Sequence, residues 1–191
     1  MSRTGSAAAL ELDHLIVFLR GPEDVDAPGL VLDEGTRHVR QGTRNRRIVF
    51  PDSYVELLRV DSPAEARATG LRFVERCAGE ACPFGVVLRG WLPDAAGFAE
   101  YTVPAGPRLL VRDDPRAPFL AVHETDDLDA LRPARRMAPE VVNSTTAIER
   151  VEIACGTAPD DLAVPGVVFV VGEPRMTVTL AGAEPLWFGV R

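Results

Sequence analysis

The sequence has no lysine, and all 21 of its basic residues are arginine. Nothing about an arginine-rich surface requires the exclusion of lysine, so we attribute this absence to a GC-rich genome rather than to chemistry. The 28 acidic residues leave a net charge of −7. Because nucleic-acid binding depends on the neutralisation of phosphates, this charge argues against a general nucleic-acid-binding protein.

Long apolar runs are also missing. The sequence has neither a run of about 18 apolar residues nor a basic-then-apolar amino terminus, so we expect no membrane span and no secretory signal. Cysteine is scarce, and Cys77, Cys82 and Cys155 lack a C-x-x-C spacing. We therefore expect reduced thiols and a cytoplasmic location. What the chain does have, 46% hydrophobic residues in 191, is enough for one substantial core.

One carboxylate lies in an apolar run. Glu56 is part of the sequence Tyr54-Val55-Glu56-Leu57-Leu58, which we interpret as a strand. Side chains alternate between the two faces of a strand, so Tyr54, Glu56 and Leu58 share a face. Burying an unpartnered carboxylate costs several kcal/mol. We therefore predict that Glu56 is either a ligand or half of an ion pair.

A histidine poses the same question near the amino terminus. In a strand over residues 10–19, the side chains of Leu10, Leu12, His14, Ile16 and Phe18 would share one face, on which His14 is the only polar group. The plain interpretation is a core histidine that donates to a backbone carbonyl. With Glu56 on another strand, the alternative is a pair of ligands for a divalent metal.

Three segments together resemble a known family. They are LDHLIVFL at 12–19, HVRQGTRNRRIVF at 38–50 and YVELLRV at 54–60. This pattern is similar to the glyoxalase-like branch of the vicinal oxygen chelate superfamily, which has an Asp-His strand, a His-x-x-Gln-Gly-Thr-x-Asn segment and a Tyr-(hydrophobic)-Glu-Leu-(hydrophobic) strand. Residues 118–125 and 147–156 resemble later strands of the same branch less closely.

The resemblance implies an α+β fold. Paired βαβββ modules would form curved mixed β-sheets around a cavity, with a divalent metal at its floor in many members. We expect a flexible amino terminus over 1–9 and a single domain over 10–191. In it, the first module would cover about 10–60, the middle strands and helices about 62–132, and the last module about 147–191, with internal symmetry between the first and the last. The resemblance implies no particular reaction.

The expected ligand set is incomplete. His14 and Glu56 are the predicted metal ligands, for Zn, Ni, Mn or Fe. Arg150, however, aligns with His14 and stands where a second metal histidine is expected, and a guanidinium cannot ligate a metal. Arg150 would instead neutralise Glu56 or bind a substrate carboxylate. The final strand over 185–190 offers no carboxylate, so a metal-free pocket is the alternative.

Other polar residues are candidates for contact with a substrate. His38, Gln41, Thr43 and Asn45 are predicted to bind it, the last three from one face of a strand. His123 ends another predicted strand and is a candidate third ligand or general base, since its ordinary pKa of about 6.5 is near working pH. Glu56 is a second candidate base.

Five arginines cluster between residues 37 and 47: Arg37, Arg40, Arg44, Arg46 and Arg47. Two interpretations stay open. They form a solvated strand face, or one or two of their guanidinium groups reach the cavity and bind an anionic substrate.

Local signals place the remaining elements. Ser62 as N-cap, Pro63 at the first position and Glu65 as the end of a capping box predict a helix, with Ala64, Ala68, Leu71 and Phe73 or Val74 facing inward. Further helices are predicted at 94–101 and 126–132, the latter stopped by Pro133. Residues 133–146 are expected to be a connector. Strands are predicted at 45–50, 54–60, 84–90, 108–112, 118–123, 147–154, 167–171, 175–180 and 186–190.

The leading functional hypothesis is an enzyme that acts on a small oxygen-rich or carbonyl substrate. A divalent metal on His14 and Glu56 would act as a Lewis acid in a lyase, an isomerase or a dioxygenase-related reaction. The alternatives are a metal-free protein that binds or sequesters a small molecule, and a metal-free enzyme of secondary metabolism. We expect a small-molecule ligand and a monomer or homodimer.

Overall fold

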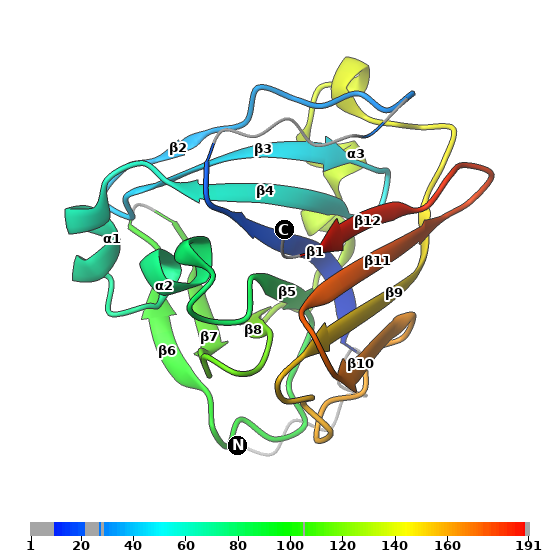
Figure 1. Cartoon of the computed structure of the whole chain (residues 1–191). Coiled ribbons are helices and arrows are strands. Elements are labelled where there is room, and N and C mark those ends of the chain that lie inside the picture. The colour runs from blue at the N-terminus through cyan, green and yellow to red at the C-terminus, as the bar shows by residue number, and fades with distance from the viewer. Residues whose placement is uncertain (1–9, 22–26, 28, 105, 190–191) are drawn as a thin grey trace.

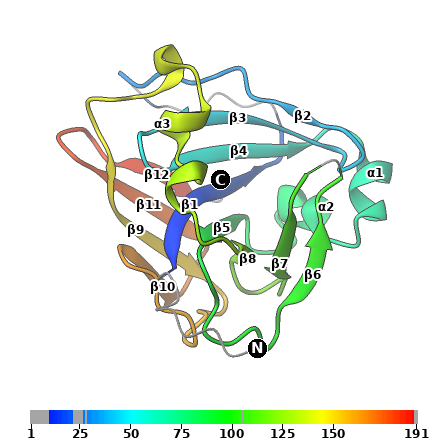
Figure 2. The ribbon, with the colours of Figure 1, turned by 180° about the vertical axis from the view of Figure 1, so that it is seen from behind.

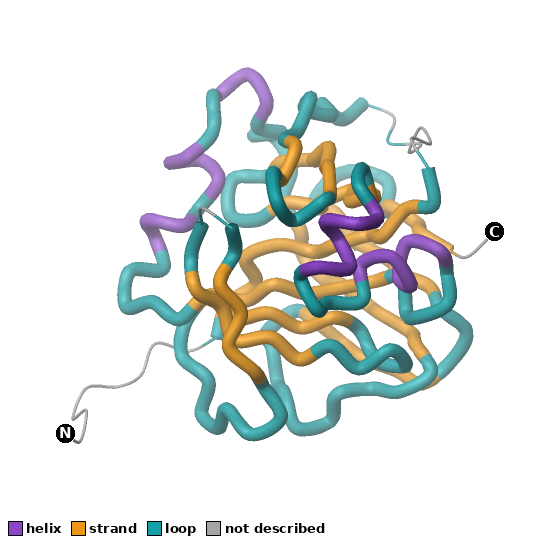
Figure 3. Tube along the Cα trace, turned by 90° about the vertical axis from the view of Figure 1, so that its left-hand side faces the viewer, coloured by secondary structure: helices purple, strands orange, loops and turns teal. Residues whose placement is uncertain are grey.

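The computed structural model describes residues 10–21, 27, 29–104 and 106–189. The predicted flexible segment 1–9 and the last residue of the predicted strand 186–190 lie outside the described residues. Strands fill the centre of the molecule and short helices lie at its edges (Figure 3). No helix among the described residues is long and apolar enough to cross a membrane.

Eight strands form one mixed sheet, in the order β2-β3-β4-β1-β5-β8-β7-β6 (Figure 1). Their bounds are β1 Glu11–Leu19, β2 Arg37–His38, β3 Thr43–Val49, β4 Tyr54–Val60, β5 Phe84–Arg89, β6 Ala99–Thr102, β7 Arg108–Arg112 and β8 Phe119–His123. The sheet curves into a half-barrel, which confirms the predicted class of curved mixed sheets.

The eight-stranded sheet consists of two modules with the same strand order. In the first module, β1 to β4, strand β1 pairs in parallel with β4, which continues to β3 and β2. In the second module, β5 to β8, strand β5 pairs in parallel with β8, which continues to β7 and β6. The two modules meet where β1 and β5 pair antiparallel.

The prediction that the last part of the chain repeats the first module was wrong. Residues 148–189 form a separate four-stranded sheet of order β10-β9-β11-β12, with strands β9 Ile148–Cys155, β10 Val167–Val171, β11 Arg175–Leu180 and β12 Leu186–Gly189. Strand β9 pairs in parallel with the next strand along the chain, β10, and antiparallel with β11, whereas the parallel partner of β1 is β4, three strands further on. Similar apolar patterns in the two first strands suggested an equivalence that the strand order does not have.

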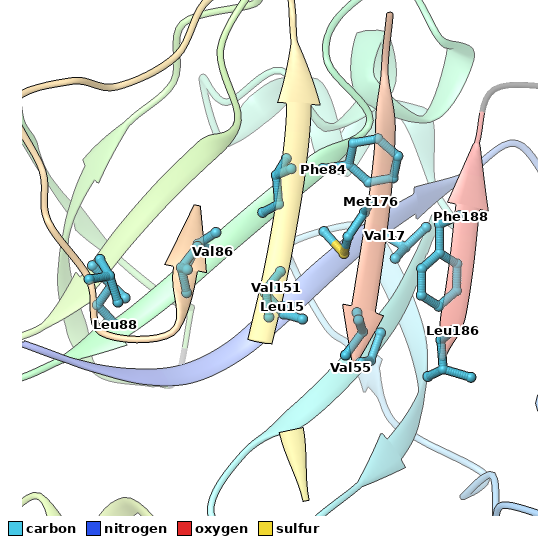
Figure 4. Close-up of a cluster of buried hydrophobic side chains, with 14 of the residues drawn as sticks. Leu15, Val17, Val55, Phe84, Val86, Leu88, Val151, Met176, Leu186 and Phe188 are labelled. Carbon is cyan, nitrogen blue, oxygen red and sulfur yellow. The ribbon is translucent and has the colours of Figure 1, made fainter. Parts of the chain in front are cut away.

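The main core lies between the two sheets. Leu15, Val55 and Phe84 project from the eight-stranded sheet toward Met176 and Phe188 of the four-stranded sheet (Figure 4). Leu15, Val55 and Met176 are fully buried. The four-stranded sheet therefore covers one face of the half-barrel, and the opposite face is left to form a pocket.

Two short helices cover part of that opposite face. Helix α1, Pro63–Ala68, begins as predicted at Ser62, whose side chain accepts a hydrogen bond from the Glu65 amide. It ends after six residues, and a second helix, α2, Phe73–Ala78, follows. Leu71, Phe73 and Val74 pack inward as predicted, but in the first helix Ala66 is the buried residue, and the predicted Ala64 and Ala68 are exposed.

Two other helix predictions were wrong. Residues 94–101 contain no helix, and their last part belongs to strand β6. Pro133 begins helix α3, Pro133–Arg136, rather than only ending the helix before it, because proline is tolerated at a first helical position. Two 3₁₀ turns, η1 Asp129–Leu131 and η2 Pro139–Val141, flank α3.

The cysteines also differ from the prediction. Cys82 and Cys155 form a disulfide, with their Cα atoms 5.9 Å apart, and only Cys77 is a free thiol. The bond joins the loop before β5 to the end of β9, and so links the two sheets. Spacing in the sequence missed it because the two residues are 73 positions apart. The cytoplasmic location stays a prediction, without the support that three reduced thiols gave it.

Candidate functional site

A β-bulge in β1 positions the first two side chains of the site. Leu12 lies opposite Leu88 and His14 lies opposite Val87, so the residue between them, Asp13, has no partner on β5. The extra residue places Asp13 and His14 on the same side of the sheet, where both line a cavity.

The bulge also corrects the predicted face of this strand. Before it, Leu10 and Leu12 pack into the core between the sheets, and Leu15 and Val17 do so after it. Strict alternation over residues 10–19 assigned Leu10 and Leu12 to the side of His14, which is wrong because one added residue exchanges the two faces.

His14 is held from three sides. Its Nδ1 atom lies 2.6 Å from Asp13 Oδ1, its Nε2 atom lies 3.5 Å from Glu56 Oε2, and its ring stacks on Tyr54 with centroids 4.3 Å apart. Burial opposes a charge on the imidazole, but the hydrogen bonds and charges of Asp13 and Glu56 outweigh it and raise the pKa of His14 to about 9. His14 is therefore an imidazolium at neutral pH.

Glu56 is the buried counter-ion of this imidazolium. The residue is only 6% exposed, and its Oε1 atom accepts a hydrogen bond of 2.6 Å from Asn45 Nδ2. Burial favours the protonated acid, yet His14 first and then His38 and Asn45 stabilise the carboxylate and lower the pKa of Glu56. Of the two roles predicted for Glu56, the geometry shows half of an ion pair.

The segment from His38 to Asn45 supports Glu56 from the next strands. His38 contacts Thr43 Oγ1 through Nδ1 at 2.9 Å and Asn45 Nδ2 through Nε2 at 3.3 Å. Asn45 Oδ1 accepts from the Thr36 amide at 2.6 Å, which fixes the amide so that its Nδ2 faces Glu56. Gly42 has φ of 69°, and a Cβ atom there would lie 2.4 Å from the Ser62 carbonyl oxygen, so this tight turn requires glycine.

A buried arginine lies behind Asp13. Arg89 of β5 is 1% exposed, and its Nη1 atom lies 3.8 Å from Asp13 Oδ2 without a hydrogen-bond partner among the described residues. Its Nη2 atom contacts Glu11 Oε2 at 3.3 Å. Asp13 therefore lies between two cationic side chains, Arg89 and His14.

These groups lie at one side of a cavity of about 290 Å³ in the hollow of the half-barrel. The first module provides most of its polar lining, namely His14, His38, Gln41, Asn45, Tyr54 and Glu56. The second module provides a largely apolar wall, namely Val87, Val103, Pro107, Leu109, Phe119 and Ala121. This volume suits a small molecule with a polar end and an apolar end.

Most of the predicted site residues meet in this cavity. His14, Glu56, His38, Gln41 and Asn45 line it, and so does His123 from the second module. Burial lowers the pKa of His123, so its imidazole is neutral at neutral pH. Thr43 is fully buried behind the lining, where it contacts His38 rather than the cavity.

Arg150 does not belong to this group. It lies exposed on β9, opposite Thr179 of β11, in the four-stranded sheet, and it is not among the residues that line the cavity. The prediction that Arg150 neutralises Glu56 or binds substrate is therefore wrong. It rested on the equivalence of β1 and β9, and His14 provides the positive charge instead.

The arginine cluster is mostly a surface feature. Arg37 binds Asp61 at 2.6 Å and Arg46 donates to the Asp33 carbonyl oxygen at 3.4 Å. Arg47 alone among the five lines the cavity, but Asp33 already holds its guanidinium at 2.6 Å. The solvated-face interpretation therefore accounts for most of the cluster.

The donor atoms do not fit a metal as they lie. No group of three or more His, Cys, Asp or Glu among the described residues is arranged to hold a metal ion. Both ring nitrogens of His14 are engaged by carboxylates, and the Asn45 amide group, a hydrogen-bond donor, lies between His38 and Glu56. We therefore derive no step through a metal.

Some lining residues gave no usable signal in the sequence. Asp13 was hidden by the assumption of strict alternation, and Arg136 of α3 lies in a segment without periodicity. Tyr101 of β6 also lines the cavity, and its hydroxyl is buried without a hydrogen-bond partner among the described residues. The short edge strand β6, which pairs with β7, overlaps the helix predicted at 94–101.

Comparison with known proteins agrees with this architecture. Residues 12–106 match the glyoxalase-like domain, so this part of the chain is a glyoxalase-like domain. A crystal structure of a hypothetical protein from Staphylococcus aureus is similar at a TM-score of 0.51 and 17% sequence identity, over 77% of this chain and 70% of that one. At this identity the likeness shows the fold alone. No curated protein matches the sequence.

Proposed function

We propose that the pocket binds a small carbonyl compound and catalyses proton transfer at the carbon next to the carbonyl group, as an isomerase or a lyase requires. The observation that carries this proposal is the charged pair of His14 and Glu56 at the polar side of a cavity whose opposite wall is apolar. An acid and a base fixed 3.5 Å apart are the two groups that enolisation needs.

The proposed step moves one proton and two electron pairs, and it needs only the substrate, Glu56 and His14. Glu56 Oε2 accepts the proton from the C–H bond, and the bonding electron pair forms a C=C bond while the carbonyl π pair moves onto oxygen. The Nε2–H group of His14 donates a hydrogen bond to that oxygen as negative charge develops. Return of the proton to the other face of the same carbon completes an epimerisation, and expulsion of a leaving group from the next carbon by the electron pair of the enolate completes an elimination.

The lowered pKa of Glu56 weakens it as a base in the empty site. A substrate oxygen that takes the Nε2–H of His14 would weaken the contact between His14 and Glu56, and the pKa of the carboxyl group would then rise. Asp13 and Arg89 would keep His14 oriented and charged throughout. The arrangement thus couples substrate binding to the strength of the base.

A binding or sequestering protein is the second candidate. It is favoured by the completeness of the network, since Glu56 has a partner for each oxygen: Asn45 and His14. A structure that satisfies its buried charges without a ligand needs no chemistry to explain them.

The test is deuterium exchange at carbon. A panel of small aldehydes, ketones and 2-oxo acids is incubated with the protein in D₂O, and the loss of C–H signals is followed by proton NMR. We expect exchange with at least one class, and a decrease of about 10²- to 10⁴-fold in Glu56→Gln. The control is Glu152→Gln, which removes a carboxylate of β9 remote from the cavity.

The outcomes separate the hypotheses. Saturable binding without exchange would favour the sequestering protein, and neither binding nor exchange would contradict both proposals. Exchange that needs added Zn²⁺, Ni²⁺, Mn²⁺ or Fe²⁺, and that a chelator abolishes, would instead support the metal-dependent alternative.

A further inference from the structure

We infer that the ligand of this pocket is a small carboxylic acid with an apolar body, and that Arg136 binds its carboxylate. This inference deepens the proposed function, since it names the substrate class for the same pocket. It rests on a cation in the lining that has no partner, which His14 and Glu56 do not explain.

Arg136 is placed at the cavity by helix α3. The helix is attached to the turn between β3 and β4, where the Ala134 amide donates to the Pro51 carbonyl oxygen at 3.1 Å (Figure 2). Arg136 lines the cavity together with Tyr54 and His123. Burial is the largest cause of the pKa shift of both residues, and the charge of Arg136 is a smaller cause that lowers the pKa of each.

The neighbouring arginines are neutralised, and Arg136 is not. Arg132 binds Asp129 at 2.8 Å and also contacts Asp52 and Glu11, and Arg135 lies 3.7 Å from Asp129. Within the described part of the chain, Arg136 has no carboxylate within ion-pair distance and no hydrogen-bond acceptor. In a protein with net charge −7, a guanidinium without a partner at a cavity is a site for an anion.

The other charges of the cavity are already balanced. Asp33 neutralises Arg47, the charge of His14 balances that of Glu56, and Arg89 balances Asp13. A neutral ligand would leave Arg136 unpaired, whereas a carboxylate would complete the balance. A guanidinium pairs with a carboxylate through two parallel hydrogen bonds, so it would also fix the orientation of the ligand.

The rest of the lining defines the body of the ligand. Across the cavity from the polar residues, Leu109, Phe119 and Val103 present apolar surface. A carboxylate at Arg136, a carbonyl group at His14 and an apolar chain or ring against the second module together describe a 2-oxo or 3-oxo acid of moderate size.

The test measures binding rather than turnover, so that it does not depend on the proposed chemistry. The probes are benzoylformate, phenylpyruvate and 2-oxohexanoate, each compared with its uncharged methyl ester by isothermal titration calorimetry. Benzoylformate has no C–H bond next to its ketone and cannot be enolised. We expect wild-type protein to bind at least one acid about 10- to 100-fold more tightly than its ester.

Substitutions at Arg136 then test whether this residue binds the carboxylate of the acid. Arg136→Gln should abolish the preference for the acid and leave ester affinity nearly unchanged, whereas Arg136→Lys should keep part of the preference. Arg135→Gln is the matched control, because Arg135 is adjacent and is exposed like Arg136, but does not line the cavity. If no acid binds more tightly than its ester, or if Arg136→Gln keeps the preference, the inference is wrong. Deuterium exchange with neutral carbonyl compounds would still stand in that case.

Discussion

The two modules of the eight-stranded sheet share one strand order but divide the cavity unequally. The first module contributes the charged and hydrogen-bonding residues around His14 and Glu56, and the second contributes a wall that is apolar apart from Tyr101 and His123 among its described lining residues. Identical topology therefore does not require identical chemistry. One module can hold the reacting groups while the other adapts to the shape of the ligand.

The comparison also explains why the described residues include no set of metal ligands. In a symmetric site, both central strands and both neighbouring strands would supply ligands. Here the lining residues of β5 and β8 are Val87, Phe119, Ala121 and His123, which include no carboxylate. The charge that a cation would carry in such a site is carried by the His14 imidazolium.

The largest expected effect concerns the attachment of the second module. The disulfide links the residues before β5 to the four-stranded sheet, and no disulfide among the described residues does so for the first module. Replacing Cys82 and Cys155 together by alanine should lower the free energy of unfolding by about 4 kcal/mol, because a bond that closes a loop of 73 residues restricts the unfolded chain. Urea unfolding measures the change.

The control for this substitution is Cys77→Ala, which removes a buried free thiol and should cost about 1 kcal/mol. Titration of thiols in unfolded, unreduced protein should find one free thiol per chain, Cys77. Three reactive thiols would show that the two sheets are not covalently linked in solution.

The second expected effect concerns the charge of the first module. The folded pKa of His14 is raised from 6.5 to about 9, so its stabilising contribution is fully present below pH 6.5 and is lost as the pH rises through 9. We expect the free energy of unfolding to fall by up to about 3 kcal/mol over this window. Chemical denaturation at about pH 6.5 and pH 9.5 measures it.

His14→Gln should remove most of this pH dependence, whereas His123→Gln in the second module should leave it nearly unchanged. The contribution of Glu56 lies in another window, because its pKa is lowered from 4.5 and its stabilisation is lost only as the pH falls through the folded value. A wild-type stability that is flat between pH 6.5 and 9 would contradict the charged state of His14.

The smallest expected effect concerns the shape of the second module. Leu109 of β7 lines the cavity, while the adjacent Leu110 packs toward the core between the sheets. Leu109→Ala should shift ligand preference toward larger apolar groups by about 1–3 kcal/mol, as measured by calorimetry across a series of 2-oxo acids. Leu110→Ala should lower stability without changing this preference, and an equal change in both variants would refute the assignment of the wall.

Much of the first module could be predicted because its signals are local. The apolar context of Glu56 indicated burial with a partner, and the pattern from His38 to Asn45 indicated a polar strand beside it. Ser62 and Pro63 marked the start of α1. Each of these inferences uses residues that are close together in the sequence, and contacts between such residues form the local structure.

The remaining features depend on contacts between distant segments. The equivalence of β1 with β5 follows from sheet pairing, which similar apolar patterns in β9 obscured. The partner of Cys82 lies 73 residues away, and Arg136 reaches the cavity only because α3 is attached near Pro51. Burial of Glu56 predicted that a partner exists, but the fold decided that it is His14 rather than Arg150.

The bulge in β1 makes the pairing of this strand, and not only its composition, a determinant of the site. If Asp13 were paired in the ladder without a bulge, every apolar residue of the strand would remain, but its two halves would fall out of phase. Either Leu10 and Leu12 would turn into the cavity, or His14 would turn into the core between the sheets. Deletion of Asp13 would instead remove the need for the bulge, leave Leu12 in the core and His14 at the cavity, and take away only the carboxylate that lies beside His14.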